Sequence, residues 1–100
     1  MFKVMIGLER REDLTPEQFR EWWLTEHAPL ARSLPGVRRI RFNVMEAGPF
    51  DGIAELWFDS AEAMGEAYAS EVGKAVAADS LAHVSARVRM PVTEHPILVQ

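Results

Sequence analysis

The chain contains 100 residues, with 11 basic and 15 acidic side chains, a formal net charge of -4 and no cysteine. This length suits one domain, residues 1–100, and is too short for two lobes with a cleft between them. The acidic balance without a basic block argues against nucleic acid as a partner, and the lack of cysteine excludes disulfides, cysteine-based zinc sites and a thiol nucleophile. No apolar run approaches the roughly 20 residues of a membrane span and no signal peptide precedes the first strand pattern, so we expect a cytoplasmic protein without a membrane partner.

The first third of the chain predicts a strand followed by a long helix. Apolar residues alternate with other residues from Phe2 to Leu8, which is the period of a strand with two unlike faces. We expect a helix to begin at Thr15 or Pro16, because Thr15 and Gln18 can form a capping box and proline suits the first helical position. This helix should run to about Leu34, where a Pro-Gly pair ends it.

The rest of the chain predicts a hairpin, a helical region and a last strand. Val37–Met45 and Ile53–Asp59 flank a turn region that contains Gly, Pro and Asp, and they should pair as a hairpin. A second helical region follows to about Asp79, with a break suggested near Ser70, and Ser85–Met90 alternates again. The order of elements predicts an α+β fold, a ferredoxin-like βαββαβ sandwich with an antiparallel sheet and both helices on one face.

The predicted hairpin has one apolar face and one mixed face. We place Asn43 opposite Glu55 and Arg41 opposite Trp57, because this register keeps the apolar residues of both strands on one side. Arg41 and Trp57 should then form a stacked cross-strand pair on the mixed side. No element of the chain is left to cover that side, and its apolar area would remain in water. We therefore expect a homodimer.

An apolar stripe with one histidine runs along the first predicted helix. Its members recur at steps of three and four residues: Phe19, Trp23, His27, Leu30 and Leu34. Imidazole titrates near neutral pH, so His27 is a candidate general acid or base, and a packed histidine bonded to a backbone carbonyl is the structural alternative. The same spacing predicts that Trp23, and not Trp22, points into the core. Glu26 points about 100° away from His27 around the helix, so we do not expect it to orient the imidazole.

Three further side chains could carry chemistry. Tyr68 lies in the apolar stripe of the second helical region, and a buried phenol could donate a hydrogen bond to a bound carbonyl, although plain packing is the alternative. His83 and His95 lie far apart in the chain and join no HxxxH or HxH pattern. We therefore expect no metal site.

Segments over most of the chain match the pattern of one known family. They are Arg11, Thr15–Phe19, Trp23, His27–Leu30, Leu34–Val37, Ala54–Asp59, Gly73–Val76 and Ala78–Asp79. In this order they resemble the EthD family, named from bacterial ether-degradation operons, within the dimeric α+β barrel superfamily. The resemblance implies a dimer in which two four-stranded sheets face one another, with a pocket between sheet and helices in each subunit.

The family resemblance implies less about the reaction than about the fold. Relatives include polyketide-tailoring dehydratases and decarboxylases, and methylmuconolactone methylisomerases that act without metal or organic cofactor. The helix histidine of the methylisomerases matches His27, whereas their strand tyrosine falls at Ile40 and their cysteine at about Leu56. These two departures argue against that particular isomerisation.

The sequence therefore predicts a cofactor-independent enzyme, of the isomerase, dehydratase or decarboxylase type, in which His27 moves a proton. The expected substrate is a small apolar carbonyl compound such as a lactone or an aromatic polyketide intermediate. The side chains expected to shape its pocket are Phe19, Trp23, Phe42, Leu56 and Tyr68. One alternative is a non-catalytic small-molecule-binding accessory protein of a degradation pathway. A haem-handling protein is a further alternative, disfavoured because Gly7 stands where such relatives would have asparagine.

Overall fold

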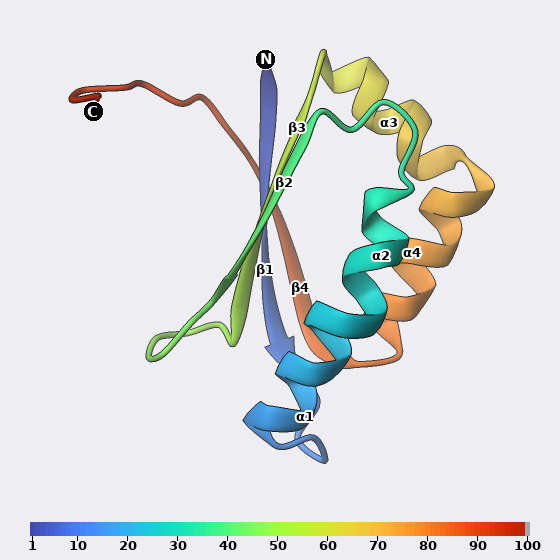
Figure 1. Cartoon of the computed structure of the whole chain (residues 1–100), viewed down its shortest axis with the longest axis vertical. Coiled ribbons are helices and arrows are strands. Elements are labelled where there is room, and N and C mark those ends of the chain that lie inside the picture. Colours follow the sequence, from blue (N-terminus) through green and yellow to red (C-terminus); the bar gives the residue numbers. More distant parts are fainter. Residues whose placement is uncertain (100) are drawn as a thin grey trace.

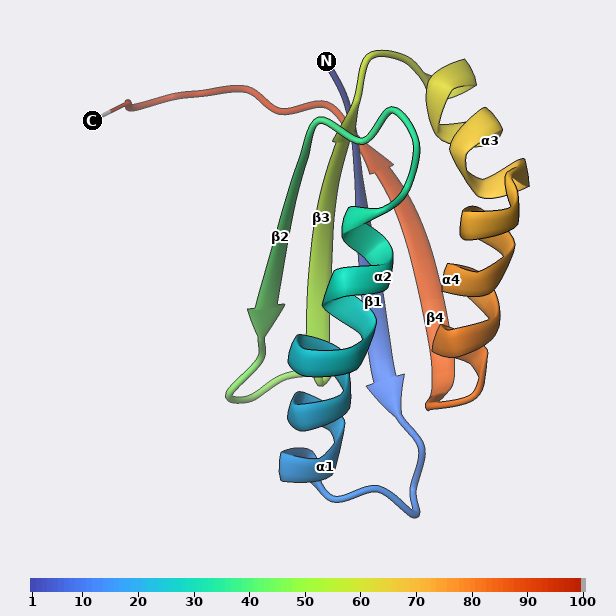
Figure 2. The ribbon, with the colours of Figure 1, turned by 45° about the vertical axis from the view of Figure 1, so that its right-hand side comes forward.

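The computed structural model describes residues 1–99 and has a four-stranded sheet covered on one face by helices (Figures 1 and 2). The sheet is antiparallel, and its strands lie in the order β2-β3-β1-β4. The strands are β1 (Phe2–Arg10), β2 (Arg39–Val44), β3 (Gly52–Phe58) and β4 (Val84–Val92). The helices are α1 (Pro16–Glu21), the π-helical turn η1 (Trp22–His27), α2 (Ala28–Arg32), α3 (Ala61–Ala69) and α4 (Glu71–Leu81). The predicted ferredoxin-like α+β fold is confirmed, and within residues 1–99 no helix has both the length and the apolar composition to cross a membrane.

The first helix begins as predicted and then departs from regular α geometry. The Thr15 hydroxyl accepts the Gln18 N–H at 3.1 Å, and the Gln18 side chain accepts the Thr15 N–H at 2.8 Å, which completes the capping box. Farther along, the Ala28 N–H donates to the Trp23 carbonyl, five residues back. Pro29 explains the change, because proline lacks an N–H and its ring crowds the carbonyl four residues earlier in an α-helix. The predicted long helix is present and ends at Arg32, close to its expected end, but it contains a π turn that was not predicted.

The π turn places two consecutive tryptophans in the core. Trp22 is 4% exposed and Trp23 is fully buried, so the prediction that only Trp23 faces the core is wrong. A π turn holds more residues than an α turn, which brings neighbouring side chains onto the same side of the helix. Trp22 stacks on His83 with ring centroids 4.3 Å apart, and Trp23 stacks on Phe42 at the same separation.

The register of the hairpin differs from the predicted one by two residues. Arg41 lies opposite Glu55, and Asn43 lies opposite Ile53. The ladder takes in Gly52, which the sequence had placed in the turn, and the Trp23 ring fills the space that a side chain on Gly52 would need, within 2.5 Å of a Cβ. A shift of two residues leaves each side chain on its predicted face, so the apolar side still meets the helices.

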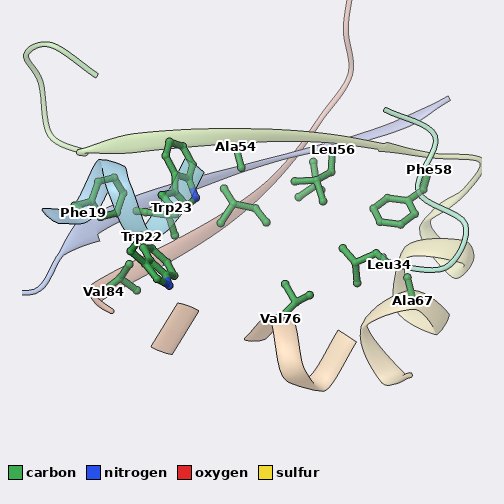
Figure 3. Close-up of a cluster of buried hydrophobic side chains, with 13 residues drawn as sticks. Phe19, Trp22, Trp23, Leu34, Ala54, Leu56, Phe58, Ala67, Val76 and Val84 are labelled. Carbon is green, nitrogen blue, oxygen red and sulfur yellow. The ribbon is translucent and has the colours of Figure 1, made fainter. Parts of the chain in front are cut away.

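The core lies between the sheet and the helical layer (Figure 3). Val4 and Phe58 from the sheet are fully buried, and helices α3 and α4 complete the opposite side. The break predicted near Ser70 is present, because this residue ends α3 and its hydroxyl accepts the Gly73 N–H at the start of α4. The two helices can therefore change direction and follow the twisted sheet.

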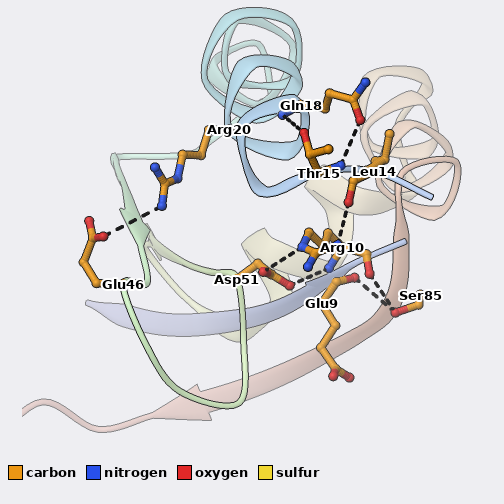
Figure 4. A network of polar contacts seen from close by, with 9 residues as sticks. All are labelled: Glu9, Arg10, Leu14, Thr15, Gln18, Arg20, Glu46, Asp51 and Ser85. Carbon is orange, nitrogen blue, oxygen red and sulfur yellow. Dashed lines mark hydrogen bonds and ion pairs between the residues drawn. The ribbon is translucent and has the colours of Figure 1, made fainter. Parts of the chain in front are cut away.

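Arg10 joins three segments at one end of the sheet (Figure 4). Its backbone N–H donates to the Asp51 carboxylate at 2.9 Å, and its guanidinium lies 3.3 Å from the same carboxylate. The guanidinium also donates to the Leu14 carbonyl at 2.5 Å. Arg10 thus connects the hairpin loop, the end of β1 and the segment before α1. These contacts fix the position of the first helix relative to the sheet.

The outer face of the sheet is mixed, as predicted. Lys3, Arg39 and Arg41 surround the Trp57 ring, with cationic groups 4.6, 5.1 and 6.0 Å from its centroid. Arg39, and not Arg41, lies directly opposite Trp57, because of the register shift. Lys3 also pairs with Glu55 at 2.8 Å. Apolar side chains continue this face on the same side of the strands: Met5, Ile53, Val88 and Met90.

Candidate functional site

A narrow pocket with a volume of about 20 Å³ lies between the sheet and the helices. Most of its lining is apolar: Ile6, Leu8, Phe42, Ala54, Leu56 and Val76. Four polar side chains from four elements also reach it: His27, Tyr68, Ser80 and Arg87. An apolar pocket with a few convergent polar groups is the usual form of a small-molecule site.

His27 and Asp79 form a hydrogen bond beside this pocket. The Nδ1 atom of His27 lies 2.8 Å from Oδ2 of Asp79, and His27 is only 5% exposed. Burial lowers the pKa of His27 below its ordinary value, although the Asp79 carboxylate acts in the opposite direction. The ring is therefore neutral at pH 7, its Nδ1–H donates to Asp79, and Nε2 carries the lone pair.

Ser80 lies on the other side of the imidazole. Its hydroxyl oxygen is 3.4 Å from Nε2 of His27, and the residue is 2% exposed. A hydrogen bond of this length is weak. A bound molecule can therefore displace the serine hydroxyl and give its proton to Nε2.

Two aromatic side chains hold Asp79 in position, one through its carboxylate and one through its backbone carbonyl. The Trp22 indole N–H lies 3.2 Å from Oδ2 and 3.3 Å from Oδ1. His83 donates from Nδ1 to the Asp79 carbonyl at 2.8 Å and lies under the Trp22 ring. The π turn thus supplies both the imidazole and the indole that meet Asp79, and the carboxylate is oriented before any ligand arrives.

The predicted pocket residues fall into two groups. His27 and four of the expected side chains line the pocket: Trp23, Phe42, Leu56 and Tyr68. Phe19 does not, because it lies behind the pocket with its ring 5.4 Å from Trp23 and 5.8 Å from Trp22. Phe19 supports the two tryptophans, and the roles of the other residues in binding stay predictions.

Sequence reasoning missed three polar residues of the site: Asp79, Ser80 and Arg87. The spacing of the second helical region contained a signal for two of them, since Val72 and Val76 lead at steps of three and four to Asp79 and Ser80. Polar residues on an apolar stripe are a reason to look for a buried partner. Arg87 lies opposite Leu8 on β1, so its side chain shares the helix-covered face of the sheet.

No group of three or more histidine, aspartate or glutamate side chains in residues 1–99 is arranged to hold a metal ion. The Asp79 carboxylate has two imidazoles near it, with Nδ1 of His83 3.5 Å from Oδ1. Both imidazoles therefore lie at hydrogen-bonding distance from the same carboxylate.

Comparison with known proteins identifies the family. A family model described as the EthD domain matches residues 11–85. The chain belongs to the EthD family. An uncharacterised 11.0 kDa protein in the thcB-thcC intergenic region of Rhodococcus erythropolis is 32% identical over 101 residues, with 94% of each chain covered. The resemblance inferred from the sequence is confirmed.

Solved structures support the same fold for this EthD protein. An EthD family protein from Bacillus halodurans is similar with a TM-score of 0.82 and 25% identity, covering 95% of this chain and 100% of the other. A dimeric ferredoxin-like protein of unknown function from Thermobifida fusca is similar with a TM-score of 0.76 and 16% identity, covering 93% of this chain and 90% of the other. The second likeness concerns the fold alone.

Proposed function

We propose that this EthD protein catalyses proton transfer on a small, largely apolar carbonyl compound, with His27 as the acid and base. One observation carries the proposal: the His27 imidazole, oriented by Asp79 at 2.8 Å, lines an apolar pocket. A base of this kind removes a proton from carbon next to a carbonyl, and such groups contribute about 10²–10⁴-fold to a rate.

The environment of His27 supports both directions of proton transfer. Burial lowers its pKa, so the base form predominates at pH 7. The imidazolium that forms on taking up a proton is stabilised by the adjacent Asp79 carboxylate. The same nitrogen can then return the proton to a different carbon or to a leaving oxygen, which covers isomerisation and dehydration.

The apolar part of the pocket lining favours a flat carbon skeleton. Trp23 and Phe42 stack with an interplanar angle of 6°, and Leu56 and Val76 add aliphatic surface. A lactone or an aromatic polyketide intermediate has this character. Exclusion of water from such a surface strengthens the electrostatic action of His27 and Asp79.

The proposal is tested by deuterium exchange at carbon. The protein is incubated in D₂O with 2-tetralone or α-angelica lactone, and loss of the proton signal next to the carbonyl is followed by NMR. We expect catalysed exchange that falls at least about 100-fold in His27→Gln and persists in His95→Gln, whose position is exposed. Equal exchange in wild type and His27→Gln would overturn the assignment of His27.

Non-catalytic binding is the second candidate function. The observation in its favour is that both ring nitrogens of His27 already have partners within the protein, Asp79 and Ser80. Under this alternative the imidazole orients a ligand without exchanging protons with carbon. Saturable chemical-shift changes with either compound, without any catalysed exchange, would favour binding over catalysis.

We also propose that the protein works as a homodimer through the outer face of the sheet. The dimeric ferredoxin-like protein of Thermobifida fusca supports this, as does the apolar surface formed by Met5, Ile53, Val88 and Met90. Among these four side chains, Val88 is exposed, with 43% of its surface accessible. Pairing of two such faces would remove this surface from water and leave each pocket on the helical side of its own sheet.

A further inference from the structure

Arg87 and Tyr68 meet at the pocket from opposite layers. Arg87 is on β4 and Tyr68 is on α3, and the guanidinium carbon lies 5.8 Å from the phenol ring centroid. Both residues are half-buried and both line the pocket. Arg87 is also near enough to His27 to contribute to the lowering of its pKa. The cation and the imidazole therefore act on the same small volume.

The charge of Arg87 has no acidic partner in the described part of the chain. Among residues 1–99 no carboxylate lies within ion-pair distance of its guanidinium. Burial lowers the pKa of Arg87, the Tyr68 hydroxyl raises it, and the nearby cation Arg89 lowers it further. A half-buried guanidinium without a counter-ion is unfavourable unless something else neutralises it. Burial raises the pKa of Tyr68, so the phenol stays protonated and adds a second donor.

A third donor, on a side chain that lines the pocket, also lacks an acceptor. The Trp23 indole N–H is buried and has no hydrogen-bond partner within residues 1–99. In Figure 3 the indole nitrogen lies on the edge of the ring toward Ala54 and away from Phe19. Buried donors are nearly always paired in folded proteins. The unpaired N–H and the guanidinium without a counter-ion both call for a bound acceptor.

We infer that the pocket binds an oxygen anion, with Arg87 and Tyr68 on the charged oxygen and the Trp23 N–H on a second acceptor atom of the same molecule. The ligand is then either a carboxylate that enters already charged or a carbonyl compound whose oxygen becomes anionic in the pocket. This inference deepens the proposed function. If the ligand is a carbonyl compound whose oxygen becomes anionic, the inference rests on that proposed function.

Charge and electrons balance when a carbonyl compound becomes anionic in the pocket. Nε2 of His27 takes the proton from carbon, the C–H electron pair forms a carbon–carbon π bond, and the carbonyl π pair moves to oxygen. The resulting enolate oxygen is held by the guanidinium and the phenol. Return of the proton from His27 to carbon restores the carbonyl. No further reactant is required.

The experiment measures preference for anions over matched neutral molecules. Affinities are determined by calorimetry for benzoate against benzamide, and for 4-nitrophenol, whose bound phenolate is detected by its visible absorption, against 4-nitroanisole. We expect the wild type to bind the anion of at least one pair at least about tenfold more tightly. We expect this preference to disappear in Arg87→Gln and to return in part in Arg87→Lys.

Arg89→Gln is the matched control, because Arg89 lies over the same Tyr68 ring at 4.7 Å but does not line the pocket. It should keep the preference for the anion. The indole N–H signal of Trp23, identified by its loss in Trp23→Phe, should shift in ¹H–¹⁵N spectra when the anion binds. Circular dichroism confirms that each variant is folded.

Each outcome decides the inference. Preference for benzoate identifies a ligand that enters as an anion, whereas preference for the phenolate alone identifies charge that develops on a conjugated oxygen. Equal affinity for anion and neutral analogue, or a preference that survives Arg87→Gln, would overturn the inference. Anion binding without any deuterium exchange at carbon would reject the proposed proton transfer and leave the anion site in place.

Discussion

Nδ1 of His27 and Oδ2 of Asp79 lie 2.8 Å apart, although 52 residues separate them in the sequence. One atom comes from the π turn in the first helical segment and the other from near the end of α4. The contact joins the two halves of the helical layer at the pocket. It also fixes which nitrogen of the imidazole is free.

Asp79→Asn should lower the pKa of His27 further. The carboxylate is the main group that raises this pKa against the effect of burial, and an amide carries no charge. NMR titration of the His27 Cε1–H signal measures the change, with the exposed Glu26→Gln as a control that should leave it unaltered. Proton transfer in the variant should be slower by ~10–100-fold, as when the partner that orients a functional histidine is lost. An unchanged or raised His27 pKa would contradict this account.

The stability of the protein should fall as the pH drops below 6.5, in part through His27. Its folded-state pKa is lower than the ordinary value of 6.5, so the unfolded chain takes up the proton first. The His27 contribution is fully present above pH 6.5 and is lost as the pH falls through the folded-state pKa. Urea unfolding from pH 8 to pH 4.5 should show a steeper decline for wild type than for His27→Gln. Parallel curves would show that burial does not shift this group.

Two glycines in neighbouring helices should respond to alanine in opposite directions. A Cβ on Gly73 would lie 2.2 Å from the Ala67 carbonyl oxygen and 2.4 Å from Cα of Tyr68, so the backbone of α3 would have to move. We expect Gly73→Ala to destabilise the protein by about 3 kcal/mol or more. Nothing lies within 4 Å of a Cβ on Gly65, and Gly65→Ala should stabilise it by roughly 0.5–1 kcal/mol. Chemical denaturation of both variants gives the comparison.

A glutamate on the outer face of the sheet should prevent dimer formation. Val88 is 43% exposed and lies beside Met5 and Met90 on that face, whereas Leu81 is 69% exposed at the end of α4. Sedimentation should give a dimer for wild type and Leu81→Glu and a monomer for Val88→Glu, because burying an unpaired carboxylate is costly. A wild-type monomer at micromolar concentration would reject the proposed dimer, and a Val88→Glu dimer would place the interface elsewhere.

The fold followed from local patterns because those patterns reflect the faces of strands and helices. Alternation located the strands, and the capping box at Thr15 and the serine at position 70 located helix starts. Hairpin register and helix regularity were missed, since both depend on contacts between distant residues. Gly52 looks like a turn residue, but it lies in the ladder with the Trp23 ring against it. Pro29 looked compatible with a long helix, and instead it accompanies a π turn.

The candidate site was predictable where one residue type carried the signal. His27 stood out as a titratable group among apolar neighbours. Its partner Asp79 did not, because a carboxylate near a helix end is ordinary on a surface, and only the packing of α4 against the π turn makes it a neighbour. Arg87 was missed because an arginine in an alternating strand is usually read as an outward residue.

The π turn also affects how this helix can be compared between relatives. The Ala28 N–H bonds five residues back to Trp23, so the segment contains one residue more than an α-helix would use to span the same turn. In a relative without this extra residue, the histidine that faces the sheet would lie one position earlier in the helix. The two sequences would then need a one-residue gap after the first tryptophan. An ungapped alignment would then equate His27 with the wrong residue. The geometry of the turn, and not the residue count from the helix start, identifies the equivalent histidine.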